Sequence, residues 1–245
     1  MAKLYVVGIG PGGKEHMTLK AIEVIQQCPV IVGYRFYITL IEELITDKEV
    51  ISTGMKGEIE RCRAAIEKVR EGIDTCIIST GDAGLYGMAG PILEMAEDIE
   101  VEVVPGVSSA FCAAAHVGAP IMHDFCSISL SDLLTPWEVI EKRIIHAAEA
   151  DFVIALYNPK SKGRTMHIEK AFELMRKYKK PDTPVAVVKH AGRSGTQKTI
   201  TKLSEVDTAD IDMMTMVIIG NHETYIASDK MITPRGYEMS RGDGR

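Results

Sequence analysis

The sequence predicts an α/β protein with two α/β domains, each built on a roughly five-stranded sheet flanked by helices. Short apolar runs of strand length alternate with amphipathic segments of helix length along nearly the whole chain. About ten such strands occur in 245 residues, and two sheets of five fit them better than one sheet of ten. Glycine-rich turns follow several strands, which is typical of strands that end at a ligand site.

The first half has the strand–helix rhythm of a mostly parallel sheet. Its clearest helix is expected over Glu58–Glu71, where apolar side chains recur on one face. The other expected strands are Leu4–Val7, Val30–Val32, Val50–Ile51, Thr75–Ser79 and Val101–Val104. The other expected helices are Thr18–Gln27, Tyr37–Ile45 and Met88–Glu97.

A second cycle of elements follows the first. Its expected strands are Cys126–Leu130, Phe152–Leu156, Val185–Val188, Lys198–Ile200 and Met216–Ile219, and its expected helices are Pro136–Ala148 and Thr165–Tyr178. Small residues with Gly118 and Pro120 indicate the join. The predicted division is a domain over 1–113, a linker over 114–124, a domain over 125–239 and a frayed tail over 240–245.

Composition excludes several classes of protein. The chain is 46% hydrophobic and 25% charged, which is ordinary for a globular protein. No apolar run reaches the ~18 residues that a membrane span needs, and the N-terminus resembles a strand and turn rather than a secretory signal, so a cytoplasmic location is expected. The five cysteines form no CxxC pair, so free thiols and no metal site are expected. A net charge of −6 with few aromatic residues disfavours nucleic-acid binding.

One segment carries the opposite charge. Residues 157–202 contain twelve Lys or Arg and three Asp or Glu, a local balance of +9. Lys160, Lys162 and Arg164 precede an expected helix, where the helix dipole disfavours cations, so we expect them to bind a small polyanion. The cations over 176–180 lie at the C-terminal end of the same helix and in its tail, and they are expected to be solvated, because the dipole favours them there.

The first glycine turn has three interpretations. Gly8, Gly10 and Gly13 fit GxGxxG, but no acid ends the second strand and Pro11 removes a backbone N–H, so dinucleotide binding is disfavoured. A tight turn without a ligand and a loop that lines a ligand cleft remain open.

Other loops also follow strands. The GDAGLYG loop begins at Gly81, where Asp82 would accept from hydroxyls or balance a cationic ligand. Ser108 would line a ligand or cap the next helix. Together with the turns after the strands of the second half, these loops favour a ligand cleft between the two halves.

The spacing of the histidines does not indicate a catalytic role. His116, His167, His190 and His222 occur singly, and neither a Ser–His–Asp spacing nor an HExxH motif is present. A lone histidine is more often a structural donor.

These motifs together resemble the tetrapyrrole (corrin/porphyrin) methylase family, over residues 8–220. The family-wide motifs are GIGPG followed by Met17-Thr18-Leu19, then GDAGLYG and PGVSSA. More specific are His123-Asp124-Phe125, SLSDLLTPW and LYNPKSKGR, which are similar to the branch that methylates C17 of precorrin-3B or cobalt-factor III.

The resemblance implies an S-adenosylmethionine-dependent methyltransferase of cobalamin biosynthesis that couples C17 methylation to ring contraction and works as a homodimer. The implied cofactor-binding residues are Pro11, Gly81, Asp82, Ala83, Leu85, Ser108, Ser109, Ala110, Tyr157, Asn158, His190 and Ala191. The implied residues for the anionic tetrapyrrole substrate are Gly10, Gly12, Lys160, Lys162, Arg164 and Arg193. The candidate catalytic residues are Asp132, Ser131, His123 and Asp124.

Alternatives remain open at this stage. Asp132 would equally serve as a cap for the helix near Pro136. A methylase acting at another ring carbon would share most of the motifs. A tetrapyrrole carrier without chemistry would bind the macrocycle but not the methyl donor.

Overall fold

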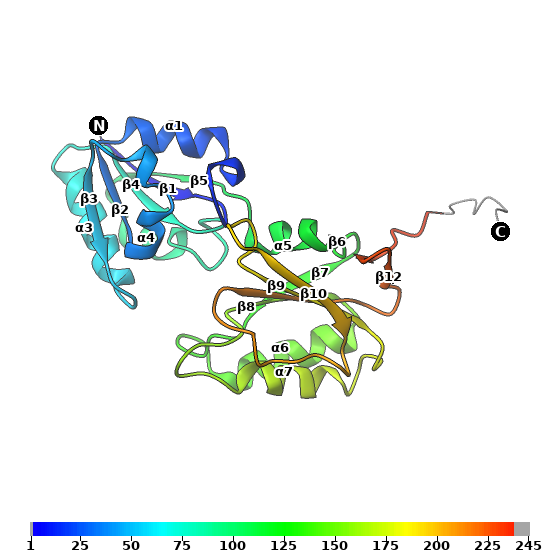
Figure 1. Cartoon of the computed structure of the whole chain (residues 1–245). Helices are drawn as coiled ribbons and strands as arrows, with labels where there is room; N and C mark the ends of the chain where they lie inside the picture. The colour runs from blue at the N-terminus through cyan, green and yellow to red at the C-terminus, as the bar shows by residue number, and fades with distance from the viewer. Residues whose placement is uncertain (1, 238–245) are drawn as a thin grey trace. The chain divides into compact units, whose positions relative to one another are not determined.

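The computed structural model describes residues 2–237, which divide into two compact units. Residues 2–112 and 191–195 make the first unit, and residues 113–190 and 196–237 make the second. Figure 1 shows a sheet with helices in each of them. The sequence instead assigned 191–195 to the second half, and it began a linker at 114. Residues 114–117 in fact belong to helix α5, Ser109–Val117.

The first sheet is entirely parallel, with the strand order β3-β2-β4-β1-β5. Its strands are β1 (Lys3–Gly8), β2 (Val30–Tyr34), β3 (Glu49–Thr53), β4 (Thr75–Ser79) and β5 (Glu100–Val104). Side chains alternate across the sheet, so each face buries its own apolar core. Because all five strands run the same way, the loops that follow them meet at one edge.

Helices cover both faces of the first sheet. On one face α3 (Glu58–Arg70) and α4 (Ala89–Met95) pack against Val6, Val32 and Ile77. On the other face α1 (Leu19–Gln27) packs against alternate residues of the same strands. The Thr18 hydroxyl caps α1 by accepting from Ala21 N at 3.1 Å.

One predicted helix of this unit is wrong in extent. The expected Tyr37–Ile45 helix is two short pieces, α2 (Arg35–Thr39) and a 3₁₀ turn, η2 (Glu42–Leu44); another 3₁₀ turn, η1 (Lys14–His16), precedes α1. The Thr39 hydroxyl donates to Phe36 O at 2.7 Å at the end of α2. Such bonding of a Thr side chain to a nearby backbone carbonyl competes with the regular hydrogen bonds of a helix.

The second sheet is mixed, with the order β10-β9-β11-β8-β7. Its strands are β7 (Phe125–Ser129), β8 (Val153–Tyr157), β9 (Pro184–Lys189), β10 (Gln197–Lys202) and β11 (Thr215–Ile219). Only the β7–β8 pair is parallel. Because β11 is antiparallel to both β8 and β9, the strands β7, β8 and β9 still share one direction.

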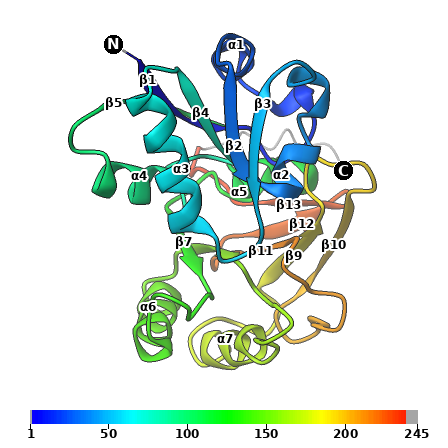
Figure 2. The same cartoon turned by 90° about the vertical axis from the view of Figure 1, so that its left-hand side faces the viewer.

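Helices α6 (Trp137–Glu149) and α7 (His167–Met175) lie side by side against the second sheet (Figure 2). Ile140, Ile144 and Phe172 enter a core with Leu156 and Val217. Burial of these side chains from two helices and a sheet explains the strong amphipathic pattern of both segments.

A third, small sheet has the order β12-β13-β6, from β6 (Gly118–Ala119), β12 (Tyr225–Ala227) and β13 (Lys230–Ile232). The sequence did not predict it. Strands of two or three residues show no period, and the β6 pairing joins segments more than 110 residues apart. The predicted tail over 240–245 lies outside the described residues.

Candidate functional site

Glycines bring three strand ends of the first sheet into backbone contact. Gly8 ends β1, while Gly81 and Gly106 follow β4 and β5. A Cβ on Gly106 would lie 2.2 Å from Gly81 O, and a Cβ on Gly8 would lie 2.7 Å from Gly106 N. Gly10 and Gly81 exchange two backbone hydrogen bonds, at 3.1 and 2.8 Å. This edge of the sheet is therefore lined by backbone, and glycine allows such close approach because it has no side chain.

Asp82 links two of these loops. Its Oδ1 accepts from Gly84 N at 2.8 Å and its Oδ2 accepts from Gly106 N at 3.0 Å. The carboxylate therefore holds the β4 loop against the β5 loop. A carboxylate has about four lone-pair positions, so these two bonds leave capacity for a ligand.

The loop after β5 leads directly into α5. Ser108 Oγ accepts from Ala110 N at 3.2 Å, so the capping interpretation of Ser108 is confirmed. Ser109 lies next to Gly81, with its Oγ 3.4 Å from where a Gly81 Cβ would be. Ala83 and Ala110 are buried and Leu85 is half-buried, so these predicted cofactor residues offer mainly backbone groups.

The 191–195 loop belongs to the first unit. A Cβ on Gly12 would lie 1.4 Å from Gly192 O, so these two backbones are in direct contact. Arg193 Nε donates to Pro11 O at 2.5 Å, and its Nη2 donates to Thr80 Oγ1 at 3.2 Å. Burial lowers the pKa of Arg193, and nearby Tyr37 partly opposes that effect. Arg193 thus fixes the Pro11 turn, a role that the sequence did not predict.

An aromatic cluster follows β2 at the same edge of this sheet. The rings of Tyr34 and Tyr37 meet edge to face at 5.1 Å, and Phe36 lies 6.2 Å from Tyr37. The Arg193 guanidinium lies 5.2 Å from the Phe36 ring, and Arg61 lies 6.0 Å from Tyr34. The sequence analysis missed this cluster, although three rings in four residues at the end of a strand were a usable signal.

Polar groups gather where β7 and β8 end in the second unit. Asn158, at a left-handed φ of 50°, donates from Nδ2 to Ser129 Oγ at 3.0 Å. Arg164 donates from Nη1 to Ser131 Oγ at 3.1 Å and from Nη2 to Asn158 O at 2.7 Å. Four predicted site residues, namely Ser131, Asp132, Asn158 and Arg164, are thereby brought into one network. Tyr157 ends β8 beside it, and His190 follows β9 with a φ of 55°.

Asp132 is the ionisable centre of this network. Its Oδ2 is 2.9 Å from His167 Nε2, and its Oδ1 is 3.8 Å from Arg164 Nη1. Burial by itself would raise the pKa of Asp132, but the His167 hydrogen bond and the Arg164 charge outweigh it and lower that pKa below its ordinary value. The capping interpretation of Asp132 is wrong, because the N-cap of α6 is Pro136 and the Asp132 oxygens face His167 and Arg164 instead.

The three predicted substrate cations do not share one set of contacts. Arg164 joins the network described above and its side chain is 11% exposed. Lys160 Nζ instead donates to Thr208 O at 3.1 Å, and Lys162 is exposed. Burial lowers the pKa of Arg164, and the Asp132 carboxylate partly offsets this effect.

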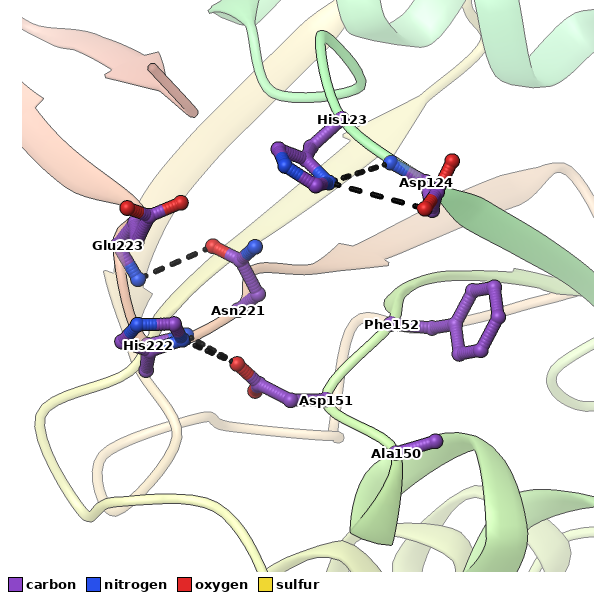
Figure 3. A pocket seen from close by; sticks show the side chains of 8 residues that line it. All are labelled: His123, Asp124, Ala150, Asp151, Phe152, Asn221, His222 and Glu223. Atoms are coloured by element: carbon purple, nitrogen blue, oxygen red, sulfur yellow. Dashed lines mark hydrogen bonds and ion pairs between the residues drawn. The ribbon is translucent and has the colours of Figure 1, made fainter. Parts of the chain in front are cut away.

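His123 and Asp124 lie at the other end of β7. They precede Phe125, whereas Ser131 and Asp132 follow Ser129, so about 16 Å of strand separates the two pairs. His123 and Asp124 line a cavity of about 310 Å³ with Ala150, Asp151, Phe152, Asn221, His222 and Glu223 (Figure 3). Three carboxylates line this cavity, which disfavours an anionic macrocycle there.

No helix over residues 2–237 is both long and apolar enough to span a bilayer. Within that range, no three His, Cys, Asp or Glu side chains converge as metal ligands would.

Comparison with known proteins adds independent findings. The family model described as Tetrapyrrole (Corrin/Porphyrin) Methylases matches residues 3–207. The chain is 52% identical to a probable cobalt-factor III C(17)-methyltransferase of Salmonella typhimurium, over 96% of this chain and 100% of the relative. It is 39% identical to a precorrin-3B C(17)-methyltransferase of Sinorhizobium, over 96% of each. The crystal structure of the methyltransferase CobJ superposes with a TM-score of 0.91 at 31% identity, covering 96% of this chain and 100% of that one.

Proposed function

Because this chain belongs to the tetrapyrrole (corrin/porphyrin) methylase family, we propose that it methylates C17 of cobalt-factor III or precorrin-3B in cobalamin biosynthesis. S-adenosylmethionine is the proposed methyl donor, and the proposed product is cobalt-precorrin-4 or precorrin-4, formed with ring contraction. The observation that carries the proposal is 52% identity to a C(17)-methyltransferase matched over its whole length. The TM-score of 0.91 to the methyltransferase CobJ supports the proposal through a comparison of structures and not of sequences alone.

The glycine edge of the first unit suits a methyl donor. A side chain at Gly106 or Gly8 would collide with backbone, so only glycine keeps these N–H and C=O groups in place. We propose that backbone groups over Gly81–Leu85 and Ser108–Ala110 hold the donor, together with Pro11 and Ala191. S-adenosylmethionine, when bound, supplies an already activated methyl group. The main task of these loops is therefore to align the reactants, an effect worth roughly 7–11 kcal/mol in favourable cases.

The network of the second unit suits the macrocycle. Arg164 is cationic and largely buried, and its position beside Asp132 gives a charge-assisted hydrogen-bond donor for an acetate or propionate arm. Ser131 and Asp132 are the proposed groups for the proton movements that accompany ring contraction. Tyr157, Asn158 and His190 are proposed to contact the donor. A homodimeric assembly and a cytoplasmic location remain predictions.

Incubation with S-adenosylmethionine labelled with ¹³C in its methyl group tests the proposal. Cobalt-factor III and precorrin-3B are supplied separately, since the two relatives differ in this part of their names. NMR of the isolated macrocycle should show the label at C17 with one of them. A label at another ring carbon would refute methylation at C17 and favour a methylase that acts at that other carbon.

A non-catalytic tetrapyrrole carrier is excluded by a separate measurement. Calorimetry with S-adenosylhomocysteine should show binding to this protein, because this molecule is what remains of the donor after methyl transfer and would occupy the same site. Macrocycle binding without any affinity for S-adenosylhomocysteine, and without transfer of label, would refute the proposed function and favour the carrier.

A further inference from the structure

The network around Asp132 contains a histidine to which the sequence gave no role. His167 is the first residue of α7, and its Nε2 lies 2.9 Å from Asp132 Oδ2. The two residues are 35 positions apart in the chain, so only the fold brings them together. The imidazole side chain is 16% exposed, whereas the Asp132 side chain is 42% exposed. The carboxylate is therefore the member of the pair that a substrate can reach.

The surroundings of His167 fix its ring and favour one tautomer. The edge-to-face contact with Trp137, at 4.5 Å and 76°, packs α6 against the ring. The Nδ1 atom is buried and has no hydrogen-bond partner among residues 2–237. A buried N–H without an acceptor is costly, so we assign the proton to Nε2, from which it is donated to Asp132.

Unsatisfied buried polar atoms are concentrated in this network. Only three buried side-chain nitrogen or oxygen atoms in the described chain lack a hydrogen-bond partner, and two of them are His167 Nδ1 and Arg164 Nε. Folded proteins keep such atoms few, and each one calls for an explanation. Both atoms here belong to groups that face the same carboxylate.

We propose that His167 is a positioning residue that fixes the Asp132 carboxylate, so that Oδ1 faces the macrocycle as an oriented, ionised acceptor. This inference rests on the proposed function, because the macrocycle is the partner that Asp132 would meet. His167 keeps its Nε2 proton, and any proton that leaves the macrocycle toward this pair is taken up by Asp132 and not by His167. His167 thus acts through Asp132 and does not touch the reacting atoms.

The charges around Asp132 agree with an ionised carboxylate. Arg164 faces its Oδ1 from the loop after β8, and His167 faces its Oδ2 from α7. Lys170, also on α7, contacts the Trp137 ring instead, with its Nζ 5.7 Å from the ring centroid. Glu169 instead accepts from Thr208 Oγ1. Arg164 and His167, the two side chains that contact the Asp132 carboxylate, therefore both favour its ionised form.

The test compares His167→Leu, which removes the donor, with His167→Gln, whose amide retains one. Carboxyl ¹³C NMR follows the titration of Asp132, with the signal assigned by its loss in Asp132→Asn. In His167→Leu the titration midpoint should rise by about one pH unit, the size expected for loss of a hydrogen bond to the charged form. In His167→Gln it should stay close to the wild-type value. His146→Leu, an exposed histidine of α6, is the matched control and should change nothing.

Methyl transfer supplies the second readout. The acid limb of the pH–rate profile should move upward in His167→Leu with the NMR midpoint, and His167→Gln should restore it. A uniform loss of activity at every pH with an unmoved limb would overturn the positioning role, as would an unchanged NMR midpoint. Wild-type protein that transfers no methyl would refute the proposed function alone, because the NMR titration needs no turnover. If His167→Leu does not fold, His167→Asn replaces it, since its shorter amide cannot reach Asp132.

Discussion

Lys179 and Asp151 form an ion pair between Nζ and Oδ1 at 3.1 Å, and the lysine side chain is only 1% exposed. The same ammonium donates to Phe152 O at 2.9 Å and to Gly220 O at 3.0 Å. The sequence predicted a solvated cation at the tail of a helix, and that prediction is wrong for Lys179. Burial lowers the pKa of Lys179, and its bond to Asp151 partly offsets the shift. One side chain therefore ties the end of α7 to the start of β8 and the end of β11.

Replacing Lys179 by Met should strongly destabilise the protein. The change leaves the buried Gly220 carbonyl and the partly buried Phe152 carbonyl without their donor and Asp151 without its cation. Removal of one partner of a buried pair typically costs about 3–5 kcal/mol. Chemical denaturation measures the free energy of unfolding. The neighbouring Lys180 is exposed, so Lys180→Met should change that free energy by less than about 0.5 kcal/mol. Equal effects of the two changes would contradict the role of Lys179.

Asp151 should make stability depend on acid pH. Burial alone would raise the pKa of Asp151, but hydrogen bonds from His222 and Lys179 lower it overall. A lowered pKa in the folded state means that the stabilisation is present above the ordinary value of about 4 and is lost as pH falls through the folded value. Asp151→Asn should therefore be less stable than wild type at neutral pH, and the difference should shrink below about pH 4. A difference that stays constant from neutral to acid pH would show that Asp151 does not titrate in this way.

Gly106→Ala should disrupt the glycine edge. The new Cβ would lie 2.2 Å from Gly81 O, and the backbone must shift to relieve that contact. We expect a loss of about 1–3 kcal/mol of stability and weaker binding of S-adenosylhomocysteine, measured by denaturation and calorimetry. Gly90→Ala, in α4, is the matched control, because the Cβ that it adds would have no neighbouring atom within 4 Å. It should keep donor affinity and gain up to about 1 kcal/mol.

Asp82→Ala should also weaken donor binding. The change removes the acceptor of Gly84 N and Gly106 N, so the loops after β4 and β5 lose their link. Loss of hydrogen bonds to a charged group is expected to cost about 1.5–3 kcal/mol in stability. Asp82→Asn keeps one side-chain oxygen and should lie between wild type and Asp82→Ala. Calorimetry with S-adenosylhomocysteine checks this order, and full affinity in Asp82→Ala would contradict it.

Arg164→Ala should weaken macrocycle binding while donor affinity stays nearly intact. Arg164 donates to Ser131 and to the Asn158 carbonyl, so Arg164→Lys, which lacks the forked guanidinium, should restore only part of the affinity. We expect a cost of about 1.5–3 kcal/mol for Arg164→Ala in a macrocycle titration. Lys177→Ala, at an exposed position after α7 with no proposed role in binding, is the control. Equal losses of macrocycle and donor affinity would mean that this loop serves both.

Local patterns predicted most elements of the fold. The strand Thr75–Ser79 has the predicted bounds, and α3 differs from its predicted helix by one residue. For the strand, the signal is an apolar run with glycine-rich turn residues after it. For the helix, the signal is the helical period of its apolar residues. The mixed strand directions of the second sheet were not predicted, because strand direction depends on how β9, β10 and β11 are connected and not on the composition of each strand.

The contacts of the candidate site were less predictable. Motifs named Asp132 and Arg164 as candidate site residues, and the structure shows that both follow the neighbouring parallel strands β7 and β8. They could not place His167 beside Asp132 or Arg193 beside Pro11, because these contacts join residues 35 and 182 positions apart. They also grouped His123 and Asp124 with Asp132, although a complete strand lies between them.

The contact between Gly192 and Gly12 restricts when the first unit can finish folding during translation. A ribosome releases the first glycine turn long before residues 191–195, yet the first unit takes in both. A nascent chain that ends before this loop lacks Arg193 and its bond to Pro11. Maturation of the first unit must therefore wait until about four-fifths of the polypeptide has been translated, and a truncated product of residues 1–112 should be unable to complete it.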